Sequence, residues 1–325
     1  MAAAEVPAEA TTERSFAANL SSQIGILRDV NEAQDPRLKG DSRLRIAAIG
    51  FLNPAPLMWD FEHPPLCVEL ARRYRIDHMA PSACAARLAS GEADIGLIPI
   101  AALATIPGLR ILPGCTIASK GRVRSLLLVH RASQTPAALR SVAADTASQT
   151  TVTYARILFG KWGNPEVPFL PLAADLDIML ERADAAIVIG DPALLSFEER
   201  NNRFERTGEE LVYLDLAEEW RALTGLPLVS AVWCTTASSR LLHESIAQDF
   251  IRSRDHGLAN IDALVAEWSK RLPISEQTIR SYLTDNIHYV LDEECLEGMR
   301  GFFRIATEYG VLPPYTVALD EMAAK

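Results

Sequence analysis

The sequence is poor in cysteine, and its cysteines are far apart. Cys67, Cys84, Cys115, Cys234 and Cys295 are the only five among 325 residues, and none has a close neighbour of its kind. An odd, scattered set in a chain of this length is typical of a reduced protein with buried thiols, not of a disulfide framework. The six histidines are also dispersed, and no HxxxH, HxxE or CxxC pattern occurs. We therefore expect no dedicated metal site.

The chain also lacks a long apolar run and a basic amino-terminal start. No stretch reaches the ~20 apolar residues that a membrane-spanning helix needs. The first residues, MAAAEVPAEATTERSF, carry Glu5 and Glu9 where a secretory signal has basic residues followed by an apolar stretch. No cysteine suitable for lipid attachment lies near the start, since the first is Cys67. These absences predict a cytoplasmic protein with no membrane partner.

Positive charge is in deficit, with 32 Lys and Arg against 42 Asp and Glu, and the formal net charge is −10. A field of that sign disfavours non-specific binding of nucleic acid, and an anionic ligand has to be held by a local site. No P-loop, no GxGxxG after a strand and no GxSxG is present. We expect no nucleic-acid partner, no nucleotide and no other cofactor.

What the sequence does have is apolar residues, which make up 49% of a chain long enough for two domains or lobes. Residues 1–42 are rich in Ala, Glu, Ser and Thr, and we expect an extension that is partly disordered. From Leu44, strand-length runs such as LRIAAIGFL, DIGLIPI and DAAIVIG alternate with helical patterns. One such helix, PSACAARLAS, is expected to stop at Gly91.

This alternation predicts an α/β fold with mainly parallel sheets, in two sets of strands. The last quarter, from LLHESIAQDF onward, is helical in pattern and forms a helical C-terminal part. In open α/β sheets, ligands gather at the carboxyl ends of the strands. Four stretches combine a strand end with small polar residues, and these are the candidate sites.

The first two candidates are Asn53 and Ser125. Asn53 follows the first strand, between Leu52 and Pro54, and its amide can both donate to and accept from a ligand. The alternative is a turn asparagine that bonds its own backbone. In GRVRS, strand alternation puts Val123 and Ser125 on one face, so Ser125 either faces a ligand or simply begins a half-buried strand.

The third and fourth candidates lie at expected helix starts. Thr150 and Thr151 precede a helix expected from Val152, where hydroxyls and free N–H groups form an anion site or a simple N-cap. Asp191, followed by proline, is typical of an N-cap, whereas Gly190 before it would let a ligand approach the backbone.

Taken in order, these stretches resemble the chorismate dehydratases of the futalosine route to menaquinone. The resemblance is carried by IGFLNPAPL, LASGEADIGLIPIAAL, GRVRSLLLV, SQTTVTYARIL, ADAAIVIGDPAL and EEWRALTGLPLVSAVW, and it covers about Leu44 to Pro314. It implies a two-lobed periplasmic-binding-protein-like (type II) fold with a ligand cleft between the lobes. Residues 43–130 plus 230–325 would form lobe one and residues 131–229 lobe two, with crossings near Val129 and Ser230.

The same resemblance implies loss of water from chorismate to give 3-[(1-carboxyvinyl)oxy]benzoate, with chorismate as the small-molecule partner. Asn53 would be the catalytic residue that holds the reacting end of the substrate. Ser125, Thr150 and Thr151 would bind the substrate carboxylates, with Gly190 and Asp191 at the cleft wall; the oligomeric state is left open.

Two departures and two alternatives accompany this assignment. Many relatives have Ser or Thr where this chain has Pro99, and Thr-Ser where it has Thr150-Thr151. One alternative is a non-catalytic solute-binding protein for a small carboxylate, which usually carries an export signal or lipid anchor. The other is the sister enzyme dihydroxynaphthoate synthase, whose motif after strand one has serine, cysteine and aspartate near the asparagine and does not match FLNPAPL.

Overall fold

The computed structural model describes residues 41–145, 149–236 and 244–317. The extension expected over residues 1–42 lies, apart from its last two residues, outside the described part. The body of the protein is the unit that begins at Arg43. Among the described residues, every helix is too short or too polar to cross a bilayer.

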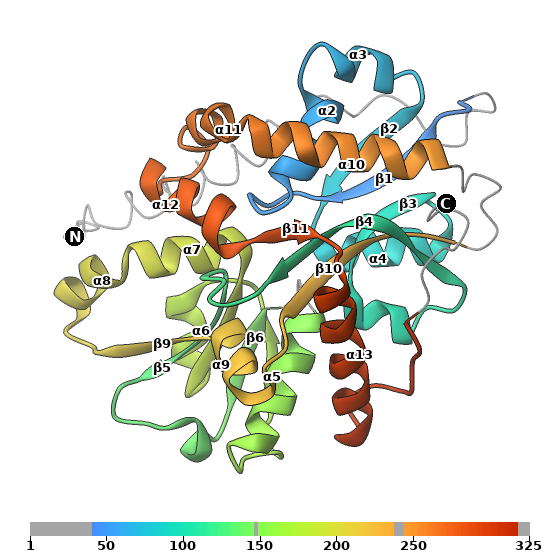
Figure 1. Ribbon diagram of the computed structural model, residues 1–325. Coiled ribbons are helices and arrows are strands. Elements are labelled where there is room, and N and C mark those ends of the chain that lie inside the picture. Colours follow the sequence, from blue (N-terminus) through green and yellow to red (C-terminus); the bar gives the residue numbers. More distant parts are fainter. Residues whose placement is uncertain (1–40, 146–148, 237–243, 318–325) are drawn as a thin grey trace, which may run out of the picture. The chain divides into compact units, whose positions relative to one another are not determined.

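The body contains two β-sheets, which confirms the two sets of strands (Figure 1). The first sheet has six strands, in the spatial order β11 (His288–Val290), β4 (Leu109–Ser119), β10 (Leu228–Thr236), β3 (Ile95–Pro99), β1 (Leu44–Ile49) and β2 (Tyr74–Met79). The second has five, in the order β7 (Phe169–Leu172), β6 (Val142–Asp145), β8 (Ala185–Ile189), β5 (Leu126–Arg131) and β9 (Leu211–Asp215).

The expectation of mainly parallel sheets is wrong, because both sheets are mixed. β1 is parallel to β2 and β3, and β6 is parallel to β7 and β8. In contrast, β10 runs antiparallel to both β3 and β4, and β5 runs antiparallel to both β8 and β9. These antiparallel strands are also long apolar runs, so their composition alone does not reveal their direction.

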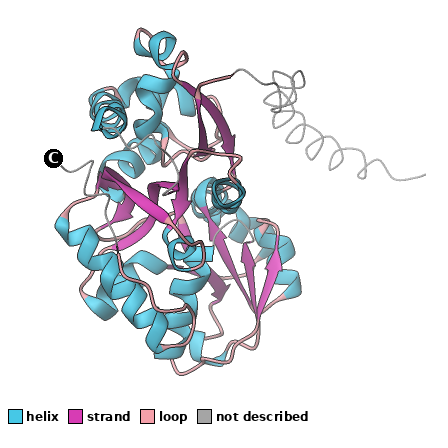
Figure 2. Cartoon of the chain, turned by 90° about the vertical axis from the view of Figure 1, so that its right-hand side faces the viewer, coloured by secondary structure: helices cyan, strands magenta, loops and turns pink. Residues whose placement is uncertain are grey.

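Helices cover the outer sides of the strands (Figure 2). Those in the first stretch of chain are η1 (Ala55–Met58), α2 (Trp59–Glu62), α3 (Leu66–Leu70), α4 (Pro81–Ser90) and η2 (Ile100–Ala104). Those among the strands of the second sheet are η3 (Pro136–Ala138), α5 (Gln149–Lys161), α6 (Leu176–Arg182), α7 (Gly190–Glu198), α8 (Arg200–Thr207) and α9 (Leu216–Thr224). The helical C-terminal part contains α10 (Glu244–Ala259), α11 (Ile261–Trp268), α12 (Glu276–Ser281), the π-helical turn η4 (Tyr282–Asn286) and α13 (Glu293–Glu308).

Local sequence signals explain several helix ends. α4 begins at Pro81, where a missing N–H costs nothing, and ends on Gly91 in the left-handed conformation, as expected. Asp215 caps α9 by accepting from the N–H groups of Ala217 and Glu218. The C-terminal helices then return to the strands: α10 packs on η1 and β4, and α13 packs on β10 and α5.

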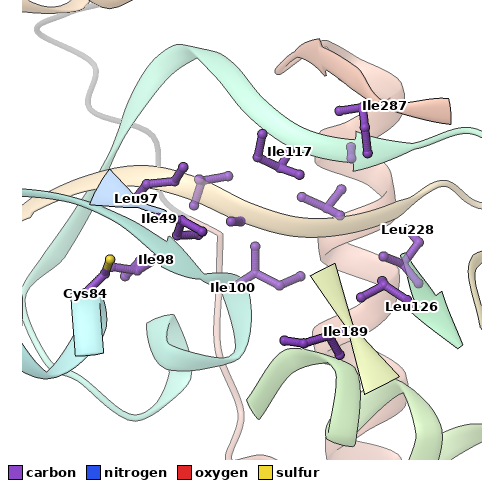
Figure 3. Packing of buried hydrophobic residues seen from close by; sticks show 14 of the residues in the cluster. Ile49, Cys84, Leu97, Ile98, Ile100, Ile117, Leu126, Ile189, Leu228 and Ile287 are labelled. Atoms are coloured by element: carbon purple, nitrogen blue, oxygen red, sulfur yellow. The ribbon is translucent and has the colours of Figure 1, made fainter. Parts of the chain in front are cut away.

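One apolar core joins the two sheets. Leu126 and Ile189 of the second sheet lie in the same buried cluster as Leu228 of the first (Figure 3). Along β5 the side chains alternate, so that Leu127 and Val129 lie in a separate cluster on the other face of the second sheet. Because both faces are covered, β5 reads as a continuous apolar run.

Sheet membership refines where the chain passes between the sheets. Val129 lies inside β5, a strand of the second sheet, and Ser230 lies inside β10, a strand of the first. The first crossing therefore lies between Ser119 and Leu126, earlier than the lobe limits expected from the sequence. Ser125 belongs to this crossing segment.

Candidate functional site

Asn53 lies in the turn between β1 and η1, at the carboxyl end of a strand in the first sheet. Pro54 precedes the first residue of η1 and Pro56 is in its first turn, so the prolines start a 3-10 turn at this strand end. The Asn53 Oδ1 atom is buried and has no hydrogen-bond partner among the described residues. The oxygen is thus not used to close its own turn, which was the alternative from the sequence.

Ser125 ends the crossing segment and is 1% exposed. Its Oγ accepts a hydrogen bond of 2.8 Å from the hydroxyl of Tyr282 in η4, and its carbonyl oxygen accepts one of 2.8 Å from the N–H of Gly190. The strand β5 begins only at Leu126, so Ser125 is held by these bonds instead of by a strand ladder.

The segment before Ser125 is fixed by Asp215. Its Oδ2 accepts from the N–H groups of Val123 (2.9 Å) and Arg124 (2.6 Å). Arg124 has a φ of 64°, a left-handed conformation that is uncommon for a residue with a side chain. Burial raises the pKa of the Asp215 carboxyl, although these N–H groups and those of Glu218 and Ala217 act in the opposite direction. Asp215 therefore connects the start of α9 with the geometry of the crossing.

Gly190 and Asp191 begin α7, so Asp191 is in the first turn and does not cap the helix. Its Oδ1 instead accepts from the N–H of Leu52, at 2.9 Å, next to Asn53. Burial raises the pKa of the Asp191 carboxyl to about 7, against the effect of that N–H. Gly190 has a φ of 62°, and a Cβ there would lie 2.7 Å from ring carbons of Phe51, so glycine is required by both backbone and space.

Thr150 and Thr151 lie in the first turn of α5, which starts at Gln149, earlier than the expected Val152. Both are 2% exposed. The Thr150 Oγ1 accepts from the N–H of Ala101 in η2, at 3.0 Å. Thr150 thereby ties the start of α5 to η2, directly after β3 and its Pro99. Among the described residues, Thr150 forms no hydrogen bond with Asn53 or Ser125.

Tyr282 is a site residue that the sequence did not single out. It is fully buried, it donates to Ser125, and the Asn53 side chain is close enough to lower the pKa of its hydroxyl. Burial raises the pKa of this hydroxyl above its ordinary value, while Ser125 and Asn53 act in the opposite direction and Asp191 adds to the rise. Its sequence context, RSYLTDNI, offers no motif; only the π-helical turn, visible in the structure, marks it.

Asn53, Ser125, Asp191 and Tyr282 thus form one group, contributed by four separate parts of the chain. Leu126 and Ile189, which adjoin Ser125 and Gly190 in the sequence, belong to the apolar core that joins the two sheets (Figure 3). The group offers a neutral amide and hydroxyls, with one carboxyl whose ionisation is shifted toward neutral pH. It is suited to hold and orient a small polar ligand by hydrogen bonds.

Other features of the surface lie away from this group. A hollow of about 430 Å³ is lined by α8 and β9 residues such as Arg203 and Tyr213, and another of about 260 Å³ lies between α5 and α9. Neither includes a candidate residue, and both are open to solvent, so we assign the site from the buried polar group instead.

One cluster of the described residues offers metal-ligand atoms, namely His288, Asp292 and Cys295. Asp292 is already engaged, because it accepts from Lys120 Nζ at 2.7 Å and from the Cys295 N–H at 2.9 Å. Burial raises the pKa of the Cys295 thiol to about 12, which disfavours the thiolate that binds metals. We interpret the cluster as the capped start of α13 and assign no metal to it.

Comparison with known proteins agrees with this architecture. A family model described as menaquinone biosynthesis matches residues 44–308. Chorismate dehydratase of Thermus thermophilus is 26% identical over 238 residues, which cover 70% of this chain and 85% of that protein.

Among solved structures, the alkanesulfonate-binding protein of Xanthomonas axonopodis pv. citri bound to MOPS matches with a TM-score of 0.61 and 14% identity, over 88% of this chain and 98% of that one. The periplasmic aliphatic sulphonate binding protein of Escherichia coli matches with a TM-score of 0.59 and 14% identity, over 87% and 94%. These two likenesses show the fold, which is that of periplasmic binding proteins.

Proposed function

Because the chain belongs to the menaquinone biosynthesis family, we propose that it is a chorismate dehydratase, which converts chorismate into 3-[(1-carboxyvinyl)oxy]benzoate and water. The family and the 26% identical relative of that name support the reaction class. The observation in the structure that carries the proposal is the buried Asn53 Oδ1, which has no hydrogen-bond partner in the described part of the chain and lies next to Ser125 and Tyr282.

The proposed reaction balances without an oxidant or reductant. A proton leaves the ring carbon that bears the ether oxygen, and the electrons of that C–H bond form the new ring double bond. The hydroxyl on the neighbouring carbon departs and combines with the proton as water. The ring becomes aromatic, which supplies the driving force, so the protein mainly orients the substrate and stabilises charge.

Asn53 is proposed to hold the leaving hydroxyl, because its free Oδ1 needs a donor and a hydroxyl is one. Ser125 binds a carboxylate, and Thr150 and Thr151, in the first turn of α5, bind another, with help from the helix N–H groups. We propose the substrate's own enolpyruvyl carboxylate as the proton acceptor. Asp191 and Gly190 form the wall beside Asn53 through the bond to Leu52.

The test is to incubate purified protein with chorismate and to follow the product by chromatography. Asn53→Ala should lower turnover by about 10²-fold or more, since it removes a group preorganised for the reacting atoms. Asn202→Ala, at an exposed position of α8, is the matched control and should retain wild-type turnover.

Two results would contradict the proposal. Binding of chorismate by the wild-type protein without conversion would favour a solute-binding protein instead. Full turnover by Asn53→Ala would still support a chorismate dehydratase but would exclude the role proposed for Asn53.

A further inference from the structure

The hydrogen bonds of Tyr282 have a direction that follows from its burial. A phenolic hydroxyl has one proton to donate, and this one is directed at the Ser125 Oγ, at 2.8 Å. Burial raises the pKa of the Tyr282 hydroxyl, so the group stays neutral and keeps its proton at any pH near neutrality. In this arrangement Tyr282 acts on Ser125 as a donor.

This direction determines what Ser125 can offer to a ligand. A serine hydroxyl has one proton and two lone pairs, and the bond from Tyr282 occupies a lone pair. Among the described residues, no hydrogen bond uses the Ser125 proton. Ser125 is thus left as a donor, and the acceptor that receives its proton has to come from the ligand.

The neighbouring Asn53 offers a hydrogen-bond acceptor to a ligand, whereas Ser125 offers a donor. The Asn53 Oδ1 is buried and has no partner within the described part of the chain. Asn53 therefore presents an acceptor, and an unsatisfied buried acceptor disfavours any ligand that brings no donor to it.

We propose that Tyr282 is a positioning residue that fixes the hydrogen-bond polarity of the site, with Ser125 as donor and Asn53 as acceptor. The ligand it selects carries a hydroxyl next to an oxygen that only accepts, such as a carboxylate or an ether oxygen. This inference rests on the proposed function, in which the leaving hydroxyl and the neighbouring enolpyruvyl group are such a pair.

The surroundings of Tyr282 are built to hold this arrangement. The same π-helical turn contains Asn286, whose Nδ2 donates to the carbonyl oxygen of Arg122 at 3.0 Å. The turn therefore holds the crossing segment at Arg122 and at Ser125, while Asp215 holds the two residues between them. π-Helical turns are found frequently at functional sites.

The experiment compares Tyr282→Phe with Tyr289→Phe in the chorismate assay. Tyr289, in β11, is also buried, and its hydroxyl has no partner among the described residues, so it controls for loss of a buried hydroxyl. We expect Tyr282→Phe to lower kcat/KM at least about tenfold. Tyr289→Phe should leave kcat/KM unchanged, and both variants should keep a melting temperature close to that of the wild type.

A double variant separates positioning from structural support. If Tyr282 acts through Ser125, Tyr282→Phe should cause little further loss in a Ser125→Ala background. Two results would overturn the inference. One is a double variant whose fold-loss in kcat/KM is the product of the two single losses, and the other is a Tyr282→Phe variant with wild-type kcat/KM. In both cases turnover by the wild-type protein would still support the dehydratase. Absence of turnover by the wild-type protein would overturn the proposed function and this inference with it.

Discussion

Asp191 should make the folded protein less stable as the pH rises, and Asp191→Asn should remove that effect. The carboxyl has its pKa raised by burial to about 7, from an ordinary 3.8. In the unfolded chain it ionises near pH 4, whereas in the folded protein it stays protonated until about pH 7. The unfolded state therefore gains stability from ionisation between these pH values, and the free energy of unfolding falls.

The size of the effect follows from the two pKa values. They differ by about three pH units, and each is worth 1.36 kcal/mol, so the full effect is about 4 kcal/mol. Asp191 is partly exposed, and water near the carboxylate reduces this cost, so we expect about 2 kcal/mol between pH 4 and pH 8. Asparagine keeps an oxygen to accept from the Leu52 N–H and carries no charge.

Chemical denaturation of the wild type and of Asp191→Asn at pH 5 and pH 8 measures the effect. The contributions of all other carboxyls to the free energy of unfolding are the same in both proteins and cancel in the difference. The variant should gain stability relative to the wild type as the pH rises. Asp184→Asn is the control: hydrogen bonds from the Arg140 side chain and N–H hold the pKa of Asp184 below its ordinary value, and Arg140 is charged at both pH values, so the effect of this substitution should be the same at pH 5 and pH 8. A constant difference for Asp191→Asn would refute the reasoning.

Two glycines should be intolerant of substitution. Gly190→Ala places a Cβ against the Phe51 ring at a positive φ, and should cost about 1–3 kcal/mol in unfolding measurements. Gly257→Ala places a Cβ against the Pro56 backbone, where α10 packs on η1. This variant should have a lower melting temperature than Gly121→Ala, whose added Cβ meets no atom within 4 Å. Equal melting temperatures would contradict the close packing.

Local signals predicted those parts of the fold that depend on nearby residues. The apolar runs around β1 and β8 indicated buried strands because both of their faces are covered, and Gly91 indicated the end of α4 because its left-handed conformation favours glycine. The direction of β10 was not predictable in this way. It pairs with β3 and β4, which lie more than a hundred residues earlier in the chain, and pairing over that distance leaves no local pattern.

The candidate site also contains residues that the local sequence predicts and residues that it does not. Asn53 and Ser125 were recognisable because each follows or precedes an apolar strand, and the structure brings both to the hydroxyl of Tyr282. Tyr282 itself is 157 positions from Ser125 and carries no motif. Asp191 was expected as a helix cap from its following proline, but its carboxyl bonds to Leu52, 139 positions away, because tertiary contact outweighs the local preference.

The position of β10 between β4 and β3 also constrains how the protein is made. The ribosome produces β3 and β4 first and then every strand of the second sheet, and only afterwards β10, which fills the gap in the first sheet. Until then the backbone N–H and C=O groups of β3 and β4 that later pair with β10 have no strand partner, and unpaired strand edges of this kind associate with other chains. The half-made protein is thus the form most exposed to aggregation, and slow synthesis between Leu126 and Leu228 prolongs that exposure.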